Sequence, residues 1–149
     1  MLVSPTPSYV AFTAKLNGHA ENLGLHQAII FDVVQTNVGG AYSTDNGMFT
    51  APAEGVYYFS ATIMCHSGTF LEAEIVHNGN HVVYMYASDS NYEQGTNSAV
   101  LEVQEGDHVW VRNARTESDK VYGNDWTTFT GFRSRETLTC SYTRTREHT

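Results

Sequence analysis

The chain has 149 residues, of which 41% are hydrophobic and 16% are charged, and its formal net charge is -8 at pH 7. This length suits one domain with a core large enough to fold without disulfides or a metal. The acidic balance argues against nucleic acid and anionic membrane surfaces as partners, since both attract basic patches. No apolar run reaches the length of a membrane span, so we expect no membrane insertion.

The N-terminus and the cysteines do not indicate in which compartment the protein acts. Residues 1–8 lack the basic and apolar regions of a signal peptide, and we interpret them as the leader of a mature chain or as an added segment. The two cysteines, Cys65 and Cys140, form neither a disulfide framework nor a zinc-binding pattern. Composition alone therefore leaves the compartment open.

From residue 9 onward, apolar and polar residues alternate, which is typical of half-buried strands. In chain order, we expect strands within residues 9–16, 29–34, 57–66, 71–75, 82–86, 99–103, 109–111 and 129–132. Turn-forming residues separate these segments, and Asn78-Gly79 is the strongest hairpin signal. About ten short strands with such spacing predict an all-β, ten-stranded jelly-roll sandwich.

The C-terminal segment differs in charge from the rest of the chain. Up to Phe132 the chain carries four basic and fourteen acidic residues, whereas residues 133–149 carry four Arg and two Glu. Leu138, Cys140 and Tyr142 alternate weakly, which would allow an edge strand. A solvated tail or a segment derived from an expression vector is the alternative. We therefore place the domain at residues 9–132.

Large and small residues recur at fixed intervals in the first half of the domain. Five, four, six and five residues separate successive members of the series Phe31, Asn37, Tyr42, Phe49 and Gly55, and Tyr57 and Phe59 follow in alternation. This series resembles the signature of the C1q globular-head family, whose domains are similar to tumour-necrosis-factor cytokines. Other segments in register are TNVGGAY, GMFTAPAEGVYYFSA, LEVQEGDHVWVRN and TFTGF. One departure is Ala61, which stands where the family has Phe or Tyr.

The resemblance covers residues 9–132 and implies a ten-stranded jelly roll that assembles as a homotrimer. Within that fold, the rings of Phe31, Phe49, Tyr57 and Phe59 would fill the space between two sheets, together with Ile63. These residues therefore have a role in core packing, and their spacing indicates the fold and not a binding site. Function has to be argued from other residues.

No catalytic motif is present, and we do not expect an enzyme. The chain has no nucleophile elbow, no zinc-protease motif and no phosphate-binding glycine loop. His77 and His81 flank the Asn78-Gly79 turn and could face each other if the loop has three residues. Two histidines without a third ligand make a poor zinc site, so we interpret them as residues of a solvated hairpin tip.

Two loops carry candidate binding residues. Asp89 and Glu93 lie in the acidic segment ASDSNYEQGTNS. The family resemblance implies that this loop could supply carboxylates and carbonyls to calcium near the trimer apex, which are the oxygen ligands calcium prefers. The alternative is a solvated acidic loop. We expect no other cofactor.

The second candidate is the segment KVYGNDWTTF, which contains Tyr122, Asn124, Asp125 and Trp126. An exposed Trp beside Asn and Asp is typical of sugar recognition, because it offers an apolar ring face and polar partners. A buried Trp that packs at the start of a strand is the alternative.

Alternation also sends large apolar side chains outward, namely Tyr58, Met64, Tyr84 or Met85, and Trp110. Such surplus apolar surface is typical of a subunit interface, and the resemblance implies a threefold one. The chain lacks a collagen-like repeat, so it resembles the solitary-head members, which are mostly secreted. The resemblance implies a secreted innate immune protein that binds microbial surface carbohydrates through the loops of a homotrimer. The alternative is a cytokine-like or scaffold protein that binds a receptor.

Overall fold

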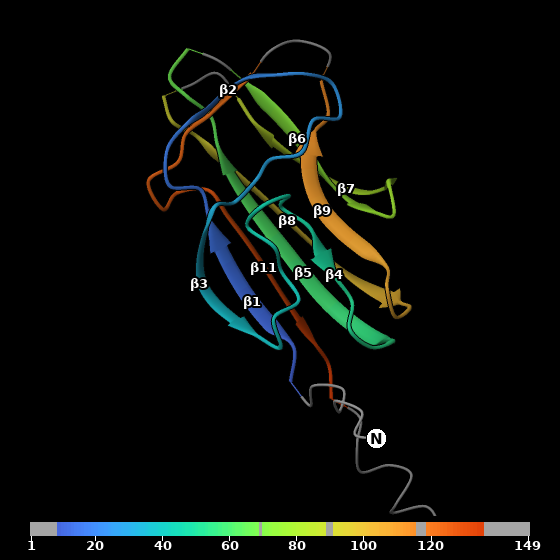
Figure 1. The fold of residues 1–149 in the computed structure, drawn as a ribbon. Helices are drawn as coiled ribbons and strands as arrows, with labels where there is room; N and C mark the ends of the chain where they lie inside the picture. The colour runs from blue at the N-terminus through green and yellow to red at the C-terminus, as the bar shows by residue number, and fades with distance from the viewer. Residues whose placement is uncertain (1–8, 69, 89–90, 116–118, 136–149) are drawn as a thin grey trace, which may run out of the picture.

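The computed structural model describes residues 9–68, 70–88, 91–115 and 119–135. Within these ranges the chain forms eleven strands and no helix, which confirms the all-β prediction (Figure 1). The described part accordingly contains no helix that is long and apolar enough to span a membrane.

The strands form two large antiparallel sheets and one small one. In spatial order, the first sheet contains β3 (Val33–Val38), β1 (Ala11–Lys15), β11 (Thr128–Arg133), β5 (Gly55–Met64) and β8 (Gln94–Val103). The second sheet contains β4 (Phe49–Thr50), β9 (His108–Asn113), β6 (Leu71–His77) and β7 (Asn80–Ala87). The short strands β10 (Asp119–Val121) and β2 (Ala20–Leu23) pair with each other. The chain passes repeatedly from one large sheet to the other, as expected for a jelly-roll sandwich.

The core lies between the two large sheets and is rich in aromatic rings. On β5, the alternating residues Tyr57, Phe59 and Ile63 are fully buried, as the sequence predicts. The ring of Phe49, from the opposite sheet, lies 5.3 Å from that of Tyr57 and 5.2 Å from that of Phe59. Edge-to-face pairs at these distances are favourable beyond the area they bury. Phe31 is also fully buried.

Asn37 has a structural role in the family series. Its side-chain amide donates to the carbonyl of Tyr42 at 2.9 Å, and its side-chain oxygen accepts the Tyr42 N–H at 3.2 Å. The Tyr42 hydroxyl then donates to the carbonyl of Phe31 at 2.7 Å. These bonds satisfy buried and part-buried polar groups in the connection that leads from β3 to β4.

The prediction of a strand over residues 29–34 is wrong in its position. The strand begins at Val33, and residues 24–32 form an irregular segment along the edge of β9. Ile29 and Phe31 are nevertheless buried, because this segment is held against β9 by its own backbone bonds. The N–H of Ile29, for example, donates to the carbonyl of Val111 at 2.9 Å.

The outward apolar residues of the sequence analysis lie on two different sheets. Tyr58 and Met64 are on the outer side of the five-stranded sheet, where Tyr58 is half-buried and Met64 is buried. Tyr84 is on the four-stranded sheet and is 51% exposed, whereas its neighbour Met85 is buried. Trp110 is half-buried on the same sheet. The five residues therefore do not form one surface.

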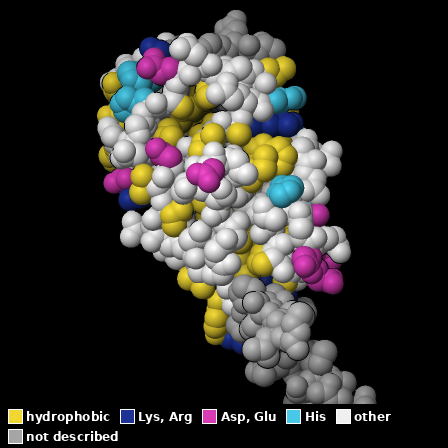
Figure 2. Space-filling view, in the orientation of Figure 1, with side chains coloured by type: hydrophobic (Ala, Val, Ile, Leu, Met, Phe, Trp, Pro, Cys, Tyr) yellow, Lys and Arg dark blue, Asp and Glu magenta, His cyan; other side chains and the backbone are white. Residues whose placement is uncertain are grey.

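The two ends of the sandwich differ. β1 begins and β11 ends at the lower end in Figure 1, whereas β2, β10 and several loops gather at the upper end. We call the upper end the loop end. Figure 2 shows histidine side chains gathered at the surface of the loop end.

Asn78 and Gly79 form the turn between β6 and β7, with positive φ values of 52° and 86°, as the hairpin prediction requires. The flanking histidines do not face each other across it. His77 Nε2 lies 2.8 Å from Asp107 Oδ2, whereas His81 Nδ1 lies 2.7 Å from Glu74 Oε1. Each histidine therefore has its own carboxylate partner.

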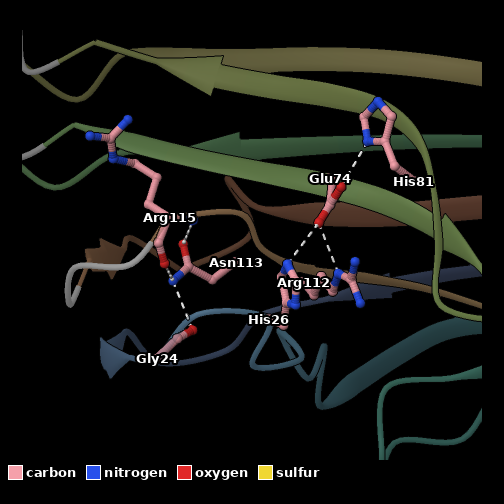
Figure 3. Close-up of polar contacts among 7 residues, drawn as sticks. All are labelled: Gly24, His26, Glu74, His81, Arg112, Asn113 and Arg115. Atoms are coloured by element: carbon pink, nitrogen blue, oxygen red, sulfur yellow. Dashed lines mark hydrogen bonds and ion pairs between the residues drawn. The ribbon is translucent and has the colours of Figure 1, made fainter.

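Glu74 is a buried carboxylate on the outer side of β6, only 3% exposed (Figure 3). Arg112 Nε donates to its Oε2 at 2.8 Å, and His26 Nε2 lies 3.9 Å from the same oxygen. Burial disfavours ionisation, but the bonds from Arg112 and His81 outweigh it, so the pKa of Glu74 is lowered. The cluster joins β6, β7, β9 and the segment before β3.

Candidate ligand-binding site

A pocket of about 210 Å³ opens at the loop end and is lined by Met64, Tyr92, Tyr122 and Trp126. Met64 is the last residue of β5, Tyr92 lies between β7 and β8, and the other two lie between β10 and β11. The walls therefore come from three separate parts of the chain. Three of the four lining side chains are aromatic, which is typical of a site that binds the apolar face of a ligand.

The segment from Tyr122 to Thr127 is tied to the end of β5 by a closed set of hydrogen bonds. The N–H of Tyr122 donates to the carbonyl of Met64 at 2.9 Å, and the N–H of Met64 donates to Thr127 Oγ1 at 3.0 Å. The Thr127 hydroxyl in turn donates to the carbonyl of Tyr122 at 2.6 Å. Thr127 is fully buried, and these bonds fix the backbone of Tyr122 against that of Met64, two residues of the pocket wall.

Trp126 is 52% exposed, so the alternative of a buried Trp does not apply. Its N–H donates to the carbonyl of Gly123 at 3.1 Å, and its carbonyl accepts from Gln94 Nε2 at 3.0 Å. The backbone is thus held on both sides while the indole ring faces the pocket and solvent. Because the backbone of Trp126 is already held, ligand binding does not have to order it.

Asn124 and Asp125 form the tip of the same turn and are both exposed. Their φ values of 53° and 72° are left-handed, a conformation that Asn and Asp tolerate better than most residues. Asp125 Oδ1 lies 3.2 Å from Lys15 Nζ, and the N–H of Asn124 donates to the carbonyl of Asn17 at 3.0 Å. The four predicted residues are therefore contiguous, with Tyr122 and Trp126 in the pocket wall and the polar pair beside it.

The acidic candidates lie on the segment that carries Tyr92. Glu93 Oε1 accepts the N–H of Ser88 at 2.6 Å, which lowers the pKa of this exposed carboxyl. The carbonyl of Glu93 accepts the N–H of Cys65, a buried residue at the end of β5. Asp89 lies outside the described residues, and the calcium site stays a prediction.

Two histidines, the exposed His19 and the half-buried His66, contact the pocket's tyrosines and were not predicted from the sequence as parts of a site. The ring of His19 stacks on Tyr122, with centroids 4.4 Å apart and planes inclined by 25°. The ring of His66 lies 5.6 Å from both His19 and Tyr122 and 5.7 Å from Tyr92. The two histidines therefore extend the group of ring contacts around Tyr92 and Tyr122.

A larger pocket of about 380 Å³ lies at the opposite end, beside Arg133 and the exposed Glu54 and Glu102. Arg133 Nη2 already donates to the carbonyl of Glu54 at 2.9 Å. We regard the smaller pocket as the candidate site because its aromatic lining has a defined recognition chemistry. Within the described ranges, no three His, Cys, Asp or Glu side chains are grouped so that they could hold a metal ion.

The C1q domain model matches residues 11–133, and the chain therefore belongs to the C1q domain family. The chain is 38% identical over 127 residues to the heavy metal-binding protein HIP of Mytilus edulis, covering 83% of this chain and 60% of that one. It is 36% identical over 133 residues to the complement C1q tumor necrosis factor-related protein 3 of Mus musculus, covering 86% and 52%. The chain thus spans roughly half to three fifths of the length of these curated relatives.

Solved structures support the same fold. The globular domain of the zebrafish complement 1qA protein superposes with a TM-score of 0.69 at 20% identity, covering 85% of this chain and 99% of that one. The Eiger TNF of S. frugiperda superposes with a TM-score of 0.71 at 13% identity, covering 87% and 94%. The jelly-roll prediction is therefore confirmed. Domains of the C1q family are non-enzymatic ligand-binding modules, in agreement with the prediction for residues 9–132.

Proposed function

We propose that this protein is a secreted recognition module that binds microbial surface carbohydrates at its loop end as a homotrimer. The observation that carries the proposal is the pocket formed by Trp126, Tyr92 and Tyr122. One face of a pyranose ring presents C–H groups, and an aromatic side chain that is half exposed offers a matching apolar surface. Family membership supports a ligand-binding function of this kind.

The polar residues beside the pocket supply the directional part of sugar recognition. Asn124 and Asp125 are exposed on the turn that ends in Trp126, and they offer amide and carboxylate groups to sugar hydroxyls. Charge-assisted and amide hydrogen bonds fix the orientation of a ligand that stacking alone would leave free to rotate. The candidate site therefore combines a stacking platform with hydrogen-bonding groups.

The homotrimer is supported by the outer side of the five-stranded sheet. One row of paired residues crosses all five strands, in the order Val38, Ala11, Phe132, Tyr58 and Val100. We call it the apolar row. Val38, Phe132 and Val100 are 49%, 46% and 67% exposed in the single chain. A continuous apolar row of this kind favours burial against another subunit, and members of this family form trimers.

In the proposed trimer, three pockets that each bind weakly can bind one ligand surface at the same time. A threefold axis along the five-stranded sheet would place the loop ends of all three subunits on the same side. Three pockets would then face one repetitive polysaccharide surface. Linked sites raise the apparent affinity by 10² or more when they can bind at the same time, as a rough guide.

The experiment is a glycan and microbial-polysaccharide binding screen with the full chain and two variants. Trp126→Ala should abolish binding, because it removes the exposed stacking surface. Tyr84→Ala is the matched control, since Tyr84 is an equally exposed aromatic residue (51%) on the other sheet. The proposal fails if no carbohydrate is bound, or if Trp126→Ala binds as well as the control. Binding to a receptor protein without a carbohydrate signal would favour the cytokine-like alternative.

A further inference from the structure

We propose that Asn17 is the site at which this protein deamidates spontaneously, and that the reaction releases the turn that carries Asn124 beside the aromatic pocket. The modification and the change in the turn are properties of the protein itself and need no ligand. The effect on carbohydrate binding rests on the proposed function. Asparagine is prone to this reaction when glycine follows it, because glycine has no Cβ to hinder attack by its nitrogen.

The reaction balances with water as the only co-reactant. The Gly18 nitrogen bonds to the side-chain carbonyl carbon of Asn17, and the bond from that carbon to the side-chain nitrogen breaks. Ammonia leaves with the proton that the Gly18 nitrogen gives up, and a cyclic succinimide remains. Water then opens the ring at either carbonyl. One opening gives aspartate, and the other gives isoaspartate, in which the main chain runs through the former side chain.

The first observation is that the structure separates three pairs that the sequence makes equal. Asn17, Asn46 and Asn78 are each followed by glycine, and all three are exposed. Asn46 Oδ1 accepts the N–H of Met48 at 2.9 Å, and Asn78 Oδ1 accepts the N–H of His108 at 2.8 Å. To react, a side chain has to close onto the following nitrogen, and for Asn46 and Asn78 that movement costs a hydrogen bond.

The side chain of Asn17 carries no such cost. Within the described ranges, neither this side chain nor the N–H of Gly18 forms a hydrogen bond. A Cβ on Gly18 would meet no atom within 4 Å, so the attacking nitrogen lies beside open space that water can enter. Gly47 differs, because its N–H donates to the carbonyl of Ser43 at 2.9 Å and its Cβ would lie 3.1 Å from the carbonyl oxygen of Ile29.

The second observation is that residues 17–19 hold the turn next to the pocket. The carbonyl of Asn17 accepts the N–H of Asn124 at 3.0 Å, and His19 Nδ1 accepts the N–H of Gly123 at 3.1 Å. Between them, the carbonyl oxygen of Gly18 would lie 1.6 Å from a Cβ on Gly123, so the two backbones are in direct contact. The turn therefore depends on the path of the main chain through residues 17–19.

Deamidation changes that path and its charge. In isoaspartate the carbonyl that accepts the Asn124 N–H leaves the main chain and becomes a free carboxylate, and the main chain is lengthened before Gly18. Both products also place a negative charge beside Asp32, whose Oδ1 accepts the N–H of Asn17 at 2.9 Å. Like charges at such short range repel each other. The modification therefore acts on both backbone bonds of residue 17.

The first test measures where the protein deamidates. The folded chain is aged in mildly alkaline buffer at physiological temperature, and cleavage after glutamate then places the three asparagines in separate peptides, 1–21, 22–54 and 75–93. Mass spectrometry reports the replacement of amide nitrogen by oxygen, and an isoaspartyl methyltransferase labels the isoaspartate. We expect peptide 1–21 to convert about fivefold faster than the other two or more, the factor that one hydrogen bond supplies.

Urea provides the internal control, because the unfolded chain presents the same Asn-Gly sequence three times. The three rates should then be similar. If peptide 22–54 or 75–93 converts as fast as peptide 1–21 in the folded protein, the inference is wrong. The same conclusion holds if urea leaves the ratio of the rates unchanged, since the structure would then not select Asn17.

The second test follows the turn with the NMR signal of the Asn124 amide in fresh and aged protein. We expect this signal to shift on ageing in the unsubstituted protein and in Asn46→Gln, but not in Asn17→Gln. Glutamine keeps the exposed amide and cyclises far more slowly, because the ring it has to close is larger. A shift that persists in Asn17→Gln, or its absence in modified unsubstituted protein, overturns the release of the turn.

A last arm compares the retention of fresh and aged protein on mannan and on lipopolysaccharide. Retention should fall in proportion to the fraction modified at Asn17, and aged Asn17→Gln should keep it. Equal retention of fresh and aged unsubstituted protein overturns the effect on binding. If the fresh protein binds neither polysaccharide, the proposed function fails, while the peptide masses and the Asn124 signal still decide the modification and its effect on the turn.

Discussion

Gly131 lies in the middle of β11, and the space that a side chain would fill at this position is occupied by two core rings. A Cβ at this position would lie 2.7 Å from the ring of Phe59 and 2.8 Å from the ring of Phe12. Both rings are buried and contact others on several sides, so neither can move away freely. The glycine in TFTGF is therefore part of the core packing.

We expect Gly131→Ala to lower the free energy of unfolding by about 1 to 3 kcal/mol, the usual cost of overpacking a core. Gly18→Ala is the matched control, since a Cβ on Gly18 meets no atom within 4 Å. Urea unfolding of the two variants measures the difference. Equal stabilities would show that the rings of Phe12 and Phe59 adjust to the added methyl group.

At the scale of single residues, the sequence predicted only half of the aromatic pocket. Trp126 and Tyr122 could be identified because they stand in one short segment with Asn and Asp, a combination with a recognised chemistry. Met64 and Tyr92 could not, because they come from other connections and meet the pocket only in the folded chain. His19 was missed for the same reason, since its contact with Tyr122 spans more than a hundred residues of sequence.

At the scale of elements, alternation predicted the long strands well and failed at irregular segments. β5 has four successive inward residues, so its period of two is unambiguous. Residues 29–34 also alternate, but Ile29 and Phe31 are buried by a segment that lies along β9 without belonging to a strand. Periodicity reports burial, and it cannot distinguish a strand from a buried connection. The two-residue strand β4 and the β2–β10 pair are too short to give a period.

In the Glu74 cluster, one buried carboxylate binds side chains from two neighbouring strands and from the segment before β3. Arg112→Met should lower the free energy of unfolding by about 3 to 5 kcal/mol, because it leaves a buried carboxylate without its strongest partner. In Arg112→Met/Glu74→Gln the loss should be smaller than the sum of the two single losses. Lys120→Met is the control, since Lys120 and Glu21 form an exposed pair worth at most about 1 kcal/mol. If the loss of unfolding free energy in the double variant equals the sum of the two single losses, Arg112 and Glu74 are not energetically coupled.

The turn between β8 and β9 should stabilise the folded protein at neutral pH and lose this contribution in acid. The N–H of Gln104 and the ring of His77 both bond Asp107 Oδ2, and they lower the pKa of Asp107 from 3.8 to about 2. A lowered pKa in the folded state stabilises the protein above the ordinary value, and this contribution is lost as pH falls from about 4 to about 2. The stability difference between the unsubstituted protein and Asp107→Asn should therefore shrink over that range. For Glu105→Gln, in the same turn, the stability difference from the unsubstituted protein should not shrink as pH falls. If the stability of Asp107→Asn and that of the unsubstituted protein change in parallel between about pH 4 and about pH 2, Asp107 is not the group responsible.

At the scale of the whole molecule, the apolar row predicts a trimer. Light scattering at micromolar concentration should give three times the 16.5 kDa of one chain. Phe132→Asp should shift the protein toward the monomer, because it places a charge in the row without removing a core residue. Tyr86→Asp, an exposed position on the other sheet, should remain trimeric. A monomeric unsubstituted protein would remove the threefold interface from the proposed function.

The calcium prediction depends on that trimer. Residues up to Phe132 carry fourteen acidic and four basic side chains, so three copies around one axis bring many carboxylates together. Screening is incomplete within a Debye length of roughly 10 Å at 0.1 M salt. If Asp89 and Glu93 lie near the axis, a bound calcium ion would relieve their repulsion and stabilise the folded trimer by linkage. Millimolar calcium should then raise the melting temperature relative to EDTA, and Asp89→Asn should abolish the rise, whereas Asp45→Asn should keep it. Superimposable melting curves with calcium and with EDTA would show that these carboxylates lie apart in water and bind no calcium.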